Sequence, residues 1–568
     1  MAVWKLKDPD PAIVARLADE FDTSDIIARV LASRGMESLE KSRAFFYPDI
    51  AHLHDPFLMR NMENAAELVK SHIKEGKKVF IFGDYDVDGT TGSAALYMFL
   101  TEIGCETKVY IPDRIAEGYG LSQAGIDTAV DWGADLLISC DCGINAVTEV
   151  AYAKSQNLKV IVTDHHTPDQ RLPDADAILN PKQPDCNYPF KGLCGGAVVF
   201  KLIQAVARLL SIGEEKVFRH LDLITLGTAA DIVPLIDENR VIVANGLKRL
   251  AKTRKPGLRA LLEVSGLGGM PLTVGRILFR AAPRINAAGR LGDANRAVQL
   301  LVSESFSEAE KLAGELDDEN RARQELQQLI VDDAFRKVNA EIDLEKERAI
   351  VLWDETWHEG VIGIVASKIK ETYNRPAVVI SLKDDIGKGS ARSVSGFDIF
   401  ENLTLCKDTL QGYGGHPMAA GLTVSRERLE DFRIRLSALA AENLDRSQVV
   451  NSLDIEGEMD LNVIDGRFMK FLEKLAPYGP GNITPKFITR NVMPSGDPKL
   501  VGKSNNHLKF KARHGKTSYD AIGFNKGNHF EKMINGKPID IAYVVEENEW
   551  QGTSSIQLNI RDIKQGVT

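Results

Sequence analysis

Residues 78–89 read KVFIFGDYDVDG, an apolar run that stops abruptly at three alternating aspartates. The apolar part, residues 79–82, is typical of a strand that is buried on both faces of a parallel sheet. Asp84, Asp86 and Asp88 then follow at every second position, and an extended chain directs such side chains the same way. The glycine that comes next lets the backbone turn closely into a helix. This stretch therefore predicts a buried strand, an acidic loop and a helix in succession.

Two further apolar runs are each followed by a short block that contains an aspartate. Residues 135–139 are followed by Cys-Asp-Cys-Gly at 140–143, and residues 159–162 by Thr-Asp-His-His at 163–166. Stretches long enough for crossover helices separate the runs, which is the rhythm of a doubly wound α/β fold. Right-handed crossovers place the carboxyl ends of all the strands at one edge of the sheet. The three acidic blocks should therefore converge at that edge.

A fourth acidic block, Ala230-Asp231-Ile232, follows the apolar residues 221–230, whose pattern is helical. Strand topology does not place Asp231, so only its similarity to the other blocks links it to them. Carboxylates and imidazoles gathered in this way suit Mg²⁺ or Mn²⁺. A calcium loop beginning at Asp84 is disfavoured because its twelfth position is Ala95 rather than Glu.

The cysteines have a structural interpretation. Cys140 and Cys142 flank Asp141, but alternation along an extended segment directs them away from the face that Asp141 uses. The chain has six cysteines and no CxxC pair, so reduced thiols are expected.

Length and composition are those of a large multidomain protein. At ~150 residues per domain, 568 residues suggest about three or four domains. No apolar run reaches about 18 residues, and the first eight residues lack a signal-peptide core, so a cytoplasmic location is expected. The net charge of −10 argues against coating of nucleic acid by bulk positive charge, but residues 481–530 hold nine Lys or Arg against two acids.

Five segments follow one another along the chain. Helical spacing dominates the first and third, α/β alternation the second and fourth, and short strands with turn signals the last, which predicts a small barrel. Charge-rich residues 307–348 are typical of a long connecting helix. The expected bounds are an N-terminal helical segment (1–48), a catalytic α/β domain (49–265), a helical connector (266–348), a second α/β domain (349–445) and a barrel (446–568).

With these motifs in order, the sequence resembles the DHH phosphoesterase superfamily, named after the triplet Asp164-His165-His166, and within it the bacterial single-strand-specific exonucleases. The resemblance spans nearly the whole chain, because further motifs occur in the expected order: residues 83–92, 139–143, 163–166, 227–235, 283–293, 389–393, 414–421 and 477–482.

The resemblance implies a doubly wound parallel-sheet DHH domain, a long connecting helix, a smaller DHH-associated α/β domain and a C-terminal OB-like β-barrel that binds nucleic acid. It also implies hydrolysis of single-stranded DNA from the 5′ end to mononucleotides, in DNA repair and recombination. The implied cofactors are Mn²⁺ or Mg²⁺ in a two-metal site, where ions about 3.5 to 4 Å apart activate water and neutralise the charge that develops on the phosphodiester.

By position, the resemblance implies a set of metal ligands and catalytic groups. Asp141 is expected to bridge the ions, His166 to lie on metal or the scissile phosphate, and Asp164 to orient one imidazole. Which of the first three aspartates touch metal stays open. The metal-ligand candidates are Asp84, Asp86, Asp88, Asp141, His165 and Asp231, and the catalytic candidates are Asp141, His165, His166 and Asp164.

An exonuclease that starts at a 5′ end also needs donors for the terminal phosphate and the strand. Arg114, Ser390 and Arg392 are candidates for the end, because arginine forks suit phosphate and the small neighbours of Ser390 would leave backbone N–H groups accessible. Tyr119 is either a base-stacking or a structural residue, and the 414–416 segment is either a close approach to substrate or a packed turn. The full set of substrate-binding candidates is Arg114, Tyr119, Arg280, Arg284, Asn286, Arg290, Ser390, Arg392, Gly414, Gly415 and His416.

Two other functions compete with this one. A superfamily relative that cleaves short oligonucleotides, cyclic dinucleotides or pyrophosphate would lack the basic C-terminal barrel, and a non-catalytic single-strand-binding replication scaffold would have lost ligand blocks that are intact here. The expected partners are single-stranded DNA, a helicase that unwinds duplex and a single-strand-binding protein, with no membrane, and the chain is expected to be a monomer.

Overall fold

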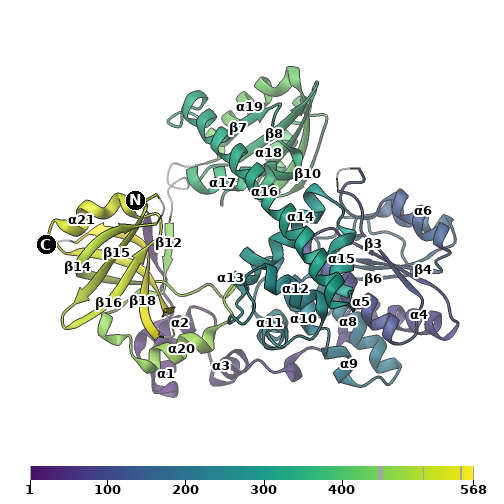
Figure 1. Ribbon diagram of the computed structural model, residues 1–568, viewed down its shortest axis with the longest axis horizontal. Coiled ribbons are helices and arrows are strands. Elements are labelled where there is room, and N and C mark those ends of the chain that lie inside the picture. Colours follow the sequence, from purple (N-terminus) through teal and green to yellow (C-terminus); the bar gives the residue numbers. More distant parts are fainter. Residues whose placement is uncertain (1, 115, 445–451, 503, 551–552, 567–568) are drawn as a thin grey trace. The chain divides into compact units, whose positions relative to one another are not determined.

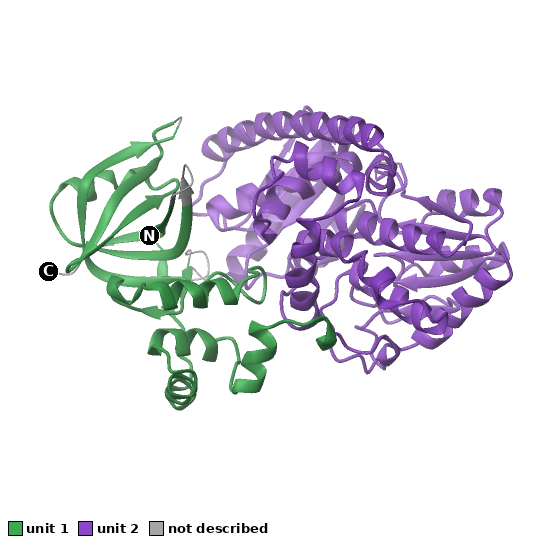
Figure 2. Cartoon of the chain, turned by 60° about the horizontal axis from the view of Figure 1, so that its bottom comes forward, with its two compact units in different colours: residues 1–52, 450–568 green, residues 53–449 purple. Residues whose placement is uncertain are grey.

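The computed structural model describes residues 2–114, 116–444, 452–502, 504–550 and 553–566. The chain divides into two compact units, a larger one of residues 53–449 and a smaller one of residues 1–52 with 450–568 (Figure 2). No helix among the described residues is both long and apolar enough to cross a membrane.

The larger unit begins with a five-stranded parallel sheet (Figure 1). In spatial order its strands are β3 (Thr107–Tyr110), β2 (Val79–Gly83), β4 (Leu136–Cys140), β5 (Lys159–Thr163) and β6 (Ala177–Leu179). The chain places β3 on one side of β2 and β4 on the other, so the winding reverses between β2 and β4. Such a switch point, at the carboxyl ends of the strands, is where open α/β sheets bind ligands.

Helices cover both faces of this sheet, so the predicted doubly wound architecture is confirmed. Phe80 and Phe82 of β2 face one layer, where they share a core with residues of α6 and α7. The opposite layer is formed by α4, α5 and α8, which contact the strands on the other face. The bounds are α4 (Met62–Lys74), α5 (Val87–Glu102), α6 (Gln123–Trp132), α7 (Val147–Ser155) and α8 (Gly195–Leu209).

The sheet is followed by a run of helices that leads to the second sheet. The longest is α16, a 36-residue helix whose N-cap residue, Ser305, accepts from the backbone N–H of Glu308. It packs on α12, α14 and α15 at one end and on α17 and β7 at the other, so the predicted long connecting helix is confirmed. The helices are α10 (Leu221–Ala230), α11 (Asp237–Leu250), α12 (Pro256–Val264), α13 (Val274–Arg276), a π-helical turn (Ile277–Ala281), α14 (Ala282–Leu291), α15 (Asn295–Val302) and α16 (Phe306–Glu341).

The second sheet of the larger unit is mixed. Only β7 and β8 run parallel, and the other neighbours are antiparallel. Helices α16 and α17 cover one face, and α18 and α19 the other. In spatial order the strands are β10 (Gly412–His416), β11 (Ala419–Ser425), β9 (Ile386–Arg392), β8 (Ala377–Lys383) and β7 (Ile350–Asp354), and the helices are α17 (Glu359–Tyr373), α18 (Ile399–Leu405) and α19 (Leu429–Asn443).

The smaller unit contains the predicted barrel. Strands β14, β15, β16, β18 and β17 pair in that order, and a further pairing of β14 with β17 closes the ring. The N-terminal helices α1 (Pro11–Phe21) and α2 (Asp25–Ala32) share its apolar core, together with α20 (Gly466–Leu475). The barrel strands are β14 (Phe487–Val501), β15 (His507–His514), β16 (Thr517–Gly523), β17 (Ile539–Trp550) and β18 (Thr553–Gln565).

One strand contradicts the sequence analysis, because β1 (Val3–Leu6) begins a segment whose pattern indicated a helix. Strand β1 pairs in parallel with β12 (Ser452–Ile455). Four residues and a partner so distant in sequence leave no periodicity from which β1 can be recognised.

Candidate active site

The acidic blocks meet at the carboxyl edge of the parallel sheet, on both sides of the switch point. The backbone N–H of Asp84 donates to Cys140 O (3.1 Å), that of Asp141 to Thr163 O (2.9 Å) and that of Asp164 to Leu179 O (3.0 Å). The first residue beyond each strand is thus hydrogen-bonded to the end of the next strand in the sheet. This ladder of backbone bonds fixes the three blocks relative to one another.

The first block continues from β2 into the start of α5. Asp86 caps the helix, because its Oδ1 accepts from the backbone N–H groups of Asp88 (2.8 Å) and Gly89 (3.0 Å). Asp88 lies in the first turn, and its Oδ1 accepts from Gly196 N at 3.2 Å. A Cβ at Gly196 would stand 2.9 Å from that same oxygen, so only glycine allows α8 to begin so close to Asp88.

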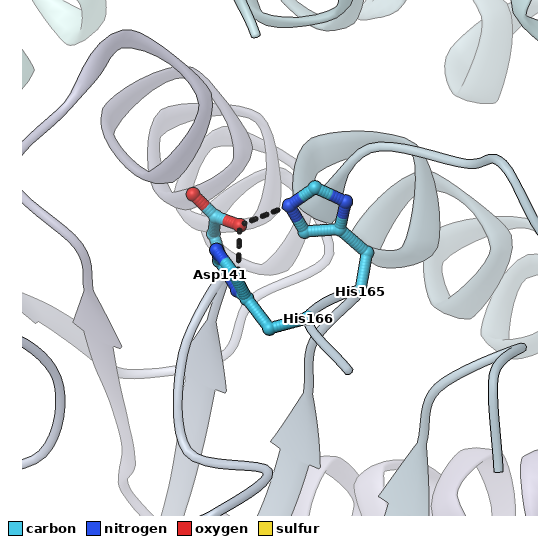
Figure 3. A group of neighbouring side chains, drawn as sticks. All are labelled: Asp141, His165 and His166. Atoms are coloured by element: carbon cyan, nitrogen blue, oxygen red, sulfur yellow. Dashed lines mark ion pairs between the residues drawn. The ribbon is translucent and has the colours of Figure 1, made fainter. Parts of the chain in front are cut away.

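His165 holds a defined tautomer. Its Nδ1 lies 3.1 Å from the carbonyl oxygen of Leu193, which can only accept, so Nδ1 carries the proton. Burial lowers the pKa of His165 to about 3, so the ring is neutral and Nε2 presents a lone pair. That lone pair faces carboxylate oxygens, 3.2 Å from Asp141 Oδ1 and 3.6 Å from Asp231 Oδ2 (Figure 3 shows the contact with Asp141). Acceptors that face one another at these distances call for a cation between them.

The carboxylates around His165 also lack hydrogen-bond donors. Among the described residues, five buried atoms of this cluster have no hydrogen-bond partner: Asp84 Oδ1, Asp88 Oδ2, Asp141 Oδ1, Asp231 Oδ2 and His165 Nε2. Burial, followed by the charges of neighbouring carboxylates, raises the pKa of Asp84, Asp141 and Asp231 well above the ordinary value. The same two causes raise the pKa of Asp88 to about 7. Divalent metal supplies the missing positive charge in such a donor set.

The ligand atoms fall into three overlapping groups in which all atoms lie within 4.8 Å of one another. The groups are Asp88, His165 and Asp231; Asp84, Asp86 and Asp141; and Asp141, His165 and His166. Asp141 belongs to two of them, and its φ of 64° turns its side chain into the cluster. The geometry therefore brings together every residue that the sequence analysis considered as a metal ligand, Asp231 from the end of α10 included.

Asp164 differs from the other carboxylates because protein donors occupy it. Its Oδ1 accepts from the backbone N–H groups of His165 (2.7 Å) and His166 (3.0 Å) and from His166 Nδ1 (2.7 Å), while Oδ2 accepts from Ile144 N (2.9 Å). Burial alone would raise the pKa of Asp164, but these bonds, the His166 side chain foremost, lower it. Asp164 thus orients His166 and lies outside the groups of potential metal ligands.

His166 and Tyr119 adjoin the cluster. The Tyr119 hydroxyl donates to Asp141 O (3.2 Å) and lies 3.1 Å from His166 Nδ1, while the residue as a whole is 53% exposed. Burial opposes the charged form of His166, but the hydrogen bond to Asp164 and the nearby negative charges outweigh it and raise its pKa. The exposed ring of Tyr119 leaves a face for a base, and its hydroxyl is held at the site.

Three of the predicted substrate-binding arginines lie close together. Arg114 stacks over the Tyr85 ring at 5.0 Å, Arg290 donates to Gly360 O (3.1 Å), and Arg392 donates to Ser390 Oγ (3.0 Å) and Ala391 O (2.8 Å). Burial and the charge of Arg114, then those of Arg323 and Arg392, lower the pKa of Arg290 to about 10. In the described part of the chain, none of Arg114, Arg290 and Arg392 forms an ion pair with a carboxylate. The arginine cluster can therefore bind an anion.

One expectation about this cluster is wrong. The segment around Ser390 was expected to expose backbone N–H groups to phosphate, but β9 lies between β8 and β11 and pairs with both. The backbone N–H groups of β9 are hydrogen-bonded to the neighbouring strands, so only the side chains of Ser390 and Arg392 can contact a ligand.

The remaining substrate candidates are not gathered in this way. Arg284 is engaged within the protein, since it pairs with Asp317 (2.8 Å) and donates to Val264 O (3.0 Å). Arg280 is exposed and donates to Gly266 O at 3.3 Å, and Asn286 is half-buried on α14. Gly414, Gly415 and His416 are exposed in β10, an edge strand, where Gly415 has a φ of 146°.

Sequence reasoning missed two contributors. The carbonyl of Leu193 sets the His165 tautomer, and a backbone group in an irregular loop leaves no signal in the sequence. Lys182 follows β6, and burial lowers its pKa although the charges of Asp231 and Asp164 oppose that shift. Its position after an apolar run, Ala177–Leu179, was the available signal, but three residues are too few to be recognised as a fourth strand.

Family models match three parts of the chain. Residues 78–228 match the DHH family N-terminal domain, residues 346–442 the DHHA1 domain, and residues 455–562 the RecJ OB domain. A single-stranded-DNA-specific exonuclease RecJ from Bacillus subtilis (strain 168) is 38% identical over 98% of this chain and 70% of its own length. The chain belongs to the RecJ family.

Other RecJ proteins agree with this assignment. The RecJ of Salmonella typhimurium is 34% identical over 95% of this chain and 96% of its own length. The crystal structure of Thermus thermophilus RecJ in complex with Mn²⁺ superimposes with a TM-score of 0.85 at 29% identity, covering 100% of this chain and 80% of that one. The Mg²⁺ complex of the same protein gives 0.79 at 28% identity, covering 100% and 79%. The fold, barrel included, is thus that of RecJ.

Proposed function

We propose that this chain is a metal-dependent exonuclease that degrades single-stranded DNA from the 5′ end to mononucleotides. The observation that carries the proposal is the neutral His165 Nε2, which faces the carboxylates of Asp141 and Asp231 within a cluster of buried atoms that lack donors. The names of the RecJ relatives, which specify single-stranded DNA, support the substrate. The RecJ crystal structures with Mn²⁺ and Mg²⁺ support the metals.

Two of the three ligand groups would hold one ion each. Asp88, His165 and Asp231 would hold one ion, and Asp84, Asp86 and Asp141 the other. Asp141 lies beside both groups, because its Oδ1 is 3.2 Å from His165 Nε2. All three aspartates of the first block then serve as ligands, with Asp86 also capping α5. When bound, the pair of ions supplies Lewis-acid activation of a water and neutralises charge that develops on the phosphodiester.

The chain's own residues orient the scissile group. Asp164 fixes the His166 ring through Nδ1. The oriented ring of His166 lies beside the metal ligands, where it meets a phosphate oxygen of the substrate, and Tyr119 presents its exposed ring to the adjacent base.

The arginine cluster recognises the 5′ end. Arg392 and Ser390 are tied to each other, and a Cβ at Gly363 of α17 would stand 3.0 Å from both, so the glycine leaves room for their side chains. Arg114 connects this cluster to the metal ligands, because it stacks on Tyr85 and its charge favours the ionised form of Asp84. A terminal phosphate bound by these guanidiniums places the first phosphodiester near the acidic cluster.

The rest of the strand is bound by residues further away. We assign Arg280, Asn286 and the exposed 414–416 segment to the strand, and Arg284 to the packing of α14 on α16 through Asp317. The catalytic machinery falls in residues 49–445, and the basic barrel of residues 446–568 binds nucleic acid. The proposal includes a monomer that acts in the cytoplasm in repair and recombination, with a helicase and a single-strand-binding protein as partners.

The test is a set of labelled substrates. Single strands and duplexes carrying label at the 5′ or the 3′ end are incubated with and without Mn²⁺. We expect labelled mononucleotide at once from 5′-labelled single strands, progressive shortening of 3′-labelled ones, slow attack on blunt duplexes, and no product in EDTA. Release from the 3′ end, or cleavage of short oligonucleotides only, would contradict the proposal.

A further inference from the structure

Two loops without regular structure determine the geometry of the metal ligands. One, residues 186–194, supplies the Leu193 carbonyl that fixes the His165 tautomer, and the other, residues 231–236, begins with Asp231 itself. His165 and Asp231 belong to the same ligand group. A shift of either loop by a few tenths of an ångström would spoil the coordination of that group.

One buried side chain bridges the two loops. The amide nitrogen of Asn239 donates to Gly192 O at 2.6 Å and to Pro234 O at 3.0 Å. Gly192 directly precedes Leu193, and Pro234 is three residues beyond Asp231. The two hydrogens of one amide group thus bond to both loops, one of which orients the His165 imidazole and the other of which carries the Asp231 carboxylate.

The start of α11, which carries Asn239, is anchored by its neighbours. Asn239 is completely buried in the first turn of α11, and its neighbour Glu238, also completely buried, accepts from the Tyr188 hydroxyl and from the backbone N–H of His54. Glu238 also pairs with Lys201 of α8, the helix whose first residues approach Asp88 and Asp141. The start of α11 is therefore anchored to the same elements that carry the ligands.

We propose that Asn239 is the positioning residue of the Asp88–His165–Asp231 ligand group. It does not touch metal or substrate. It acts through the Leu193 carbonyl and through the loop that carries Asp231, and it holds both in the geometry that the ligand group needs. This inference rests on the proposed metal-dependent function.

The test compares Mn²⁺ affinity, measured by the EPR signal of free Mn²⁺ during titration of the full-length chain. Asn239→Ala removes both bonds, while Asn239→Asp keeps nearly the same volume but sets a carboxyl group, which only accepts when ionised, against both carbonyl oxygens. Substitution of groups that orient ligands typically costs about 10- to 100-fold in metal affinity. We expect a loss in that range for Asn239→Ala and at least as large a loss for Asn239→Asp, in the weaker of two successive binding steps. Saturating Mn²⁺ should restore most of the turnover number.

Asn245→Ala is the matched control. Asn245 lies on the same helix and also donates its amide to a backbone carbonyl, that of Val241 (2.8 Å), within α11 itself. Its Mn²⁺ affinity should stay within twofold of the wild type, whatever its melting temperature. If Asn239→Ala loses stability but binds Mn²⁺ as tightly as the wild type, Asn239 is merely structural and the inference is wrong. If the wild type itself binds no Mn²⁺, the proposed function fails instead.

Discussion

The metal-ligand cluster has an excess of negative charge and hydrogen-bond acceptors, whereas the arginine cluster has an excess of positive charge. In the first, burial and then the charges of neighbouring carboxylates raise the pKa of Asp141, and an imidazole lone pair adds a further acceptor. In the second, burial and then neighbouring guanidiniums lower the pKa of Arg290 and Arg392. Arg114 is close to both clusters, since its charge acts to lower the pKa of Asp84 and of Arg290. Adjacent sites for cations and for an anion suit a substrate whose terminal phosphate and scissile phosphate are neighbours.

A third buried set of charges in the same unit is balanced. Lys201 and Glu238 pair with each other out of contact with solvent, and Glu238 accepts further bonds from Tyr188 and His54. Every charge there has a protein partner, as expected of a structural network. Buried charge alone therefore does not mark a ligand site, whereas buried charge without a protein partner does.

The largest effect should follow from Asp141→Asn. The substitution removes a ligand that belongs to two of the three groups, and asparagine tolerates the φ of 64° that Asp141 adopts. We expect nucleotide release in Mn²⁺ to fall by more than the roughly 100-fold at the upper end for groups that merely orient ligands. Release of mononucleotides from a 5′-labelled single strand measures this loss.

Asp135→Asn provides the comparison for that variant, because Asp135 precedes the opposite end of β4 and accepts from Lys78 N. It should retain activity. Nucleotide release by Asp141→Asn at a rate near that of Asp135→Asn would remove Asp141 from the metal site.

The sequence predicted the acidic cluster where strand topology decides it. Buried runs ending at Asp84, Asp141 and Asp164 must converge once the sheet is parallel, and the ladder of backbone bonds is the physical form of that rule. Asp231 was harder, because it ends helix α10 and the packing of that helix is tertiary information. The resemblance of the ordered motifs linked it to the site.

What the sequence could not predict depends on bonds between distant loops. Asn239 lies in the polar run Asp-Glu-Asn-Arg, which has the composition of a solvated helix start, yet three of these four side chains are buried. The same holds for two arginines of α14. The sequence predicts one role for Arg284 and Arg290, and only their tertiary contacts, with Asp317 and with Gly360, distinguish the two residues.

The arginine cluster should be tested with Arg392→Ala. Hydrogen bonds to charged groups contribute about 1.5–3 kcal/mol, so we expect kcat/KM on 5′-phosphorylated strands to fall by about 10- to 100-fold. Strands with a 5′ hydroxyl should be affected by less than about threefold, because they lack the anion that Arg392 binds. Arg435→Ala, which breaks an exposed pair with Asp408 in the same domain, should change neither value. An equal loss on both kinds of end would contradict the assignment to the 5′ phosphate.

The acidic cluster should also give the metal-free protein an unusual pH dependence. A carboxyl whose pKa is raised on folding stabilises the fold below its ordinary pKa, and this contribution is lost as pH rises through the folded value. For Asp88 that window runs from about pH 4 to about pH 7. His165 acts in the opposite sense, since its pKa is lowered to about 3 and its contribution is lost as pH falls below about 6.5.

Urea unfolding in EDTA at several pH values isolates the Asp88 contribution. We expect the wild type to lose stability relative to Asp88→Asn as pH rises from about 4 to 7, by up to about 4 kcal/mol given about 1.4 kcal/mol for each unit of pKa shift. Saturating Mn²⁺ should stabilise the wild type most at the upper end of this range. A difference between the two proteins that does not vary with pH would show that Asp88 is ionised in the metal-free fold.

The smallest effect on DNA degradation should come from Arg284→Lys. Arg284 is already paired with Asp317, and lysine keeps the charge of that pair while it loses the fork that also reaches Val264 O. We expect a lower melting temperature but less than about a twofold change in kcat/KM on either kind of 5′ end, since the charge of Arg284 already has a carboxylate partner in the protein. Arg392→Lys, measured alongside, should keep its stability and lose activity on phosphorylated ends. Opposite outcomes of the two Arg→Lys substitutions would show that Arg284 has a structural role and that Arg392 binds the substrate. An equal loss of activity in Arg284→Lys would instead show that Arg284 binds the strand.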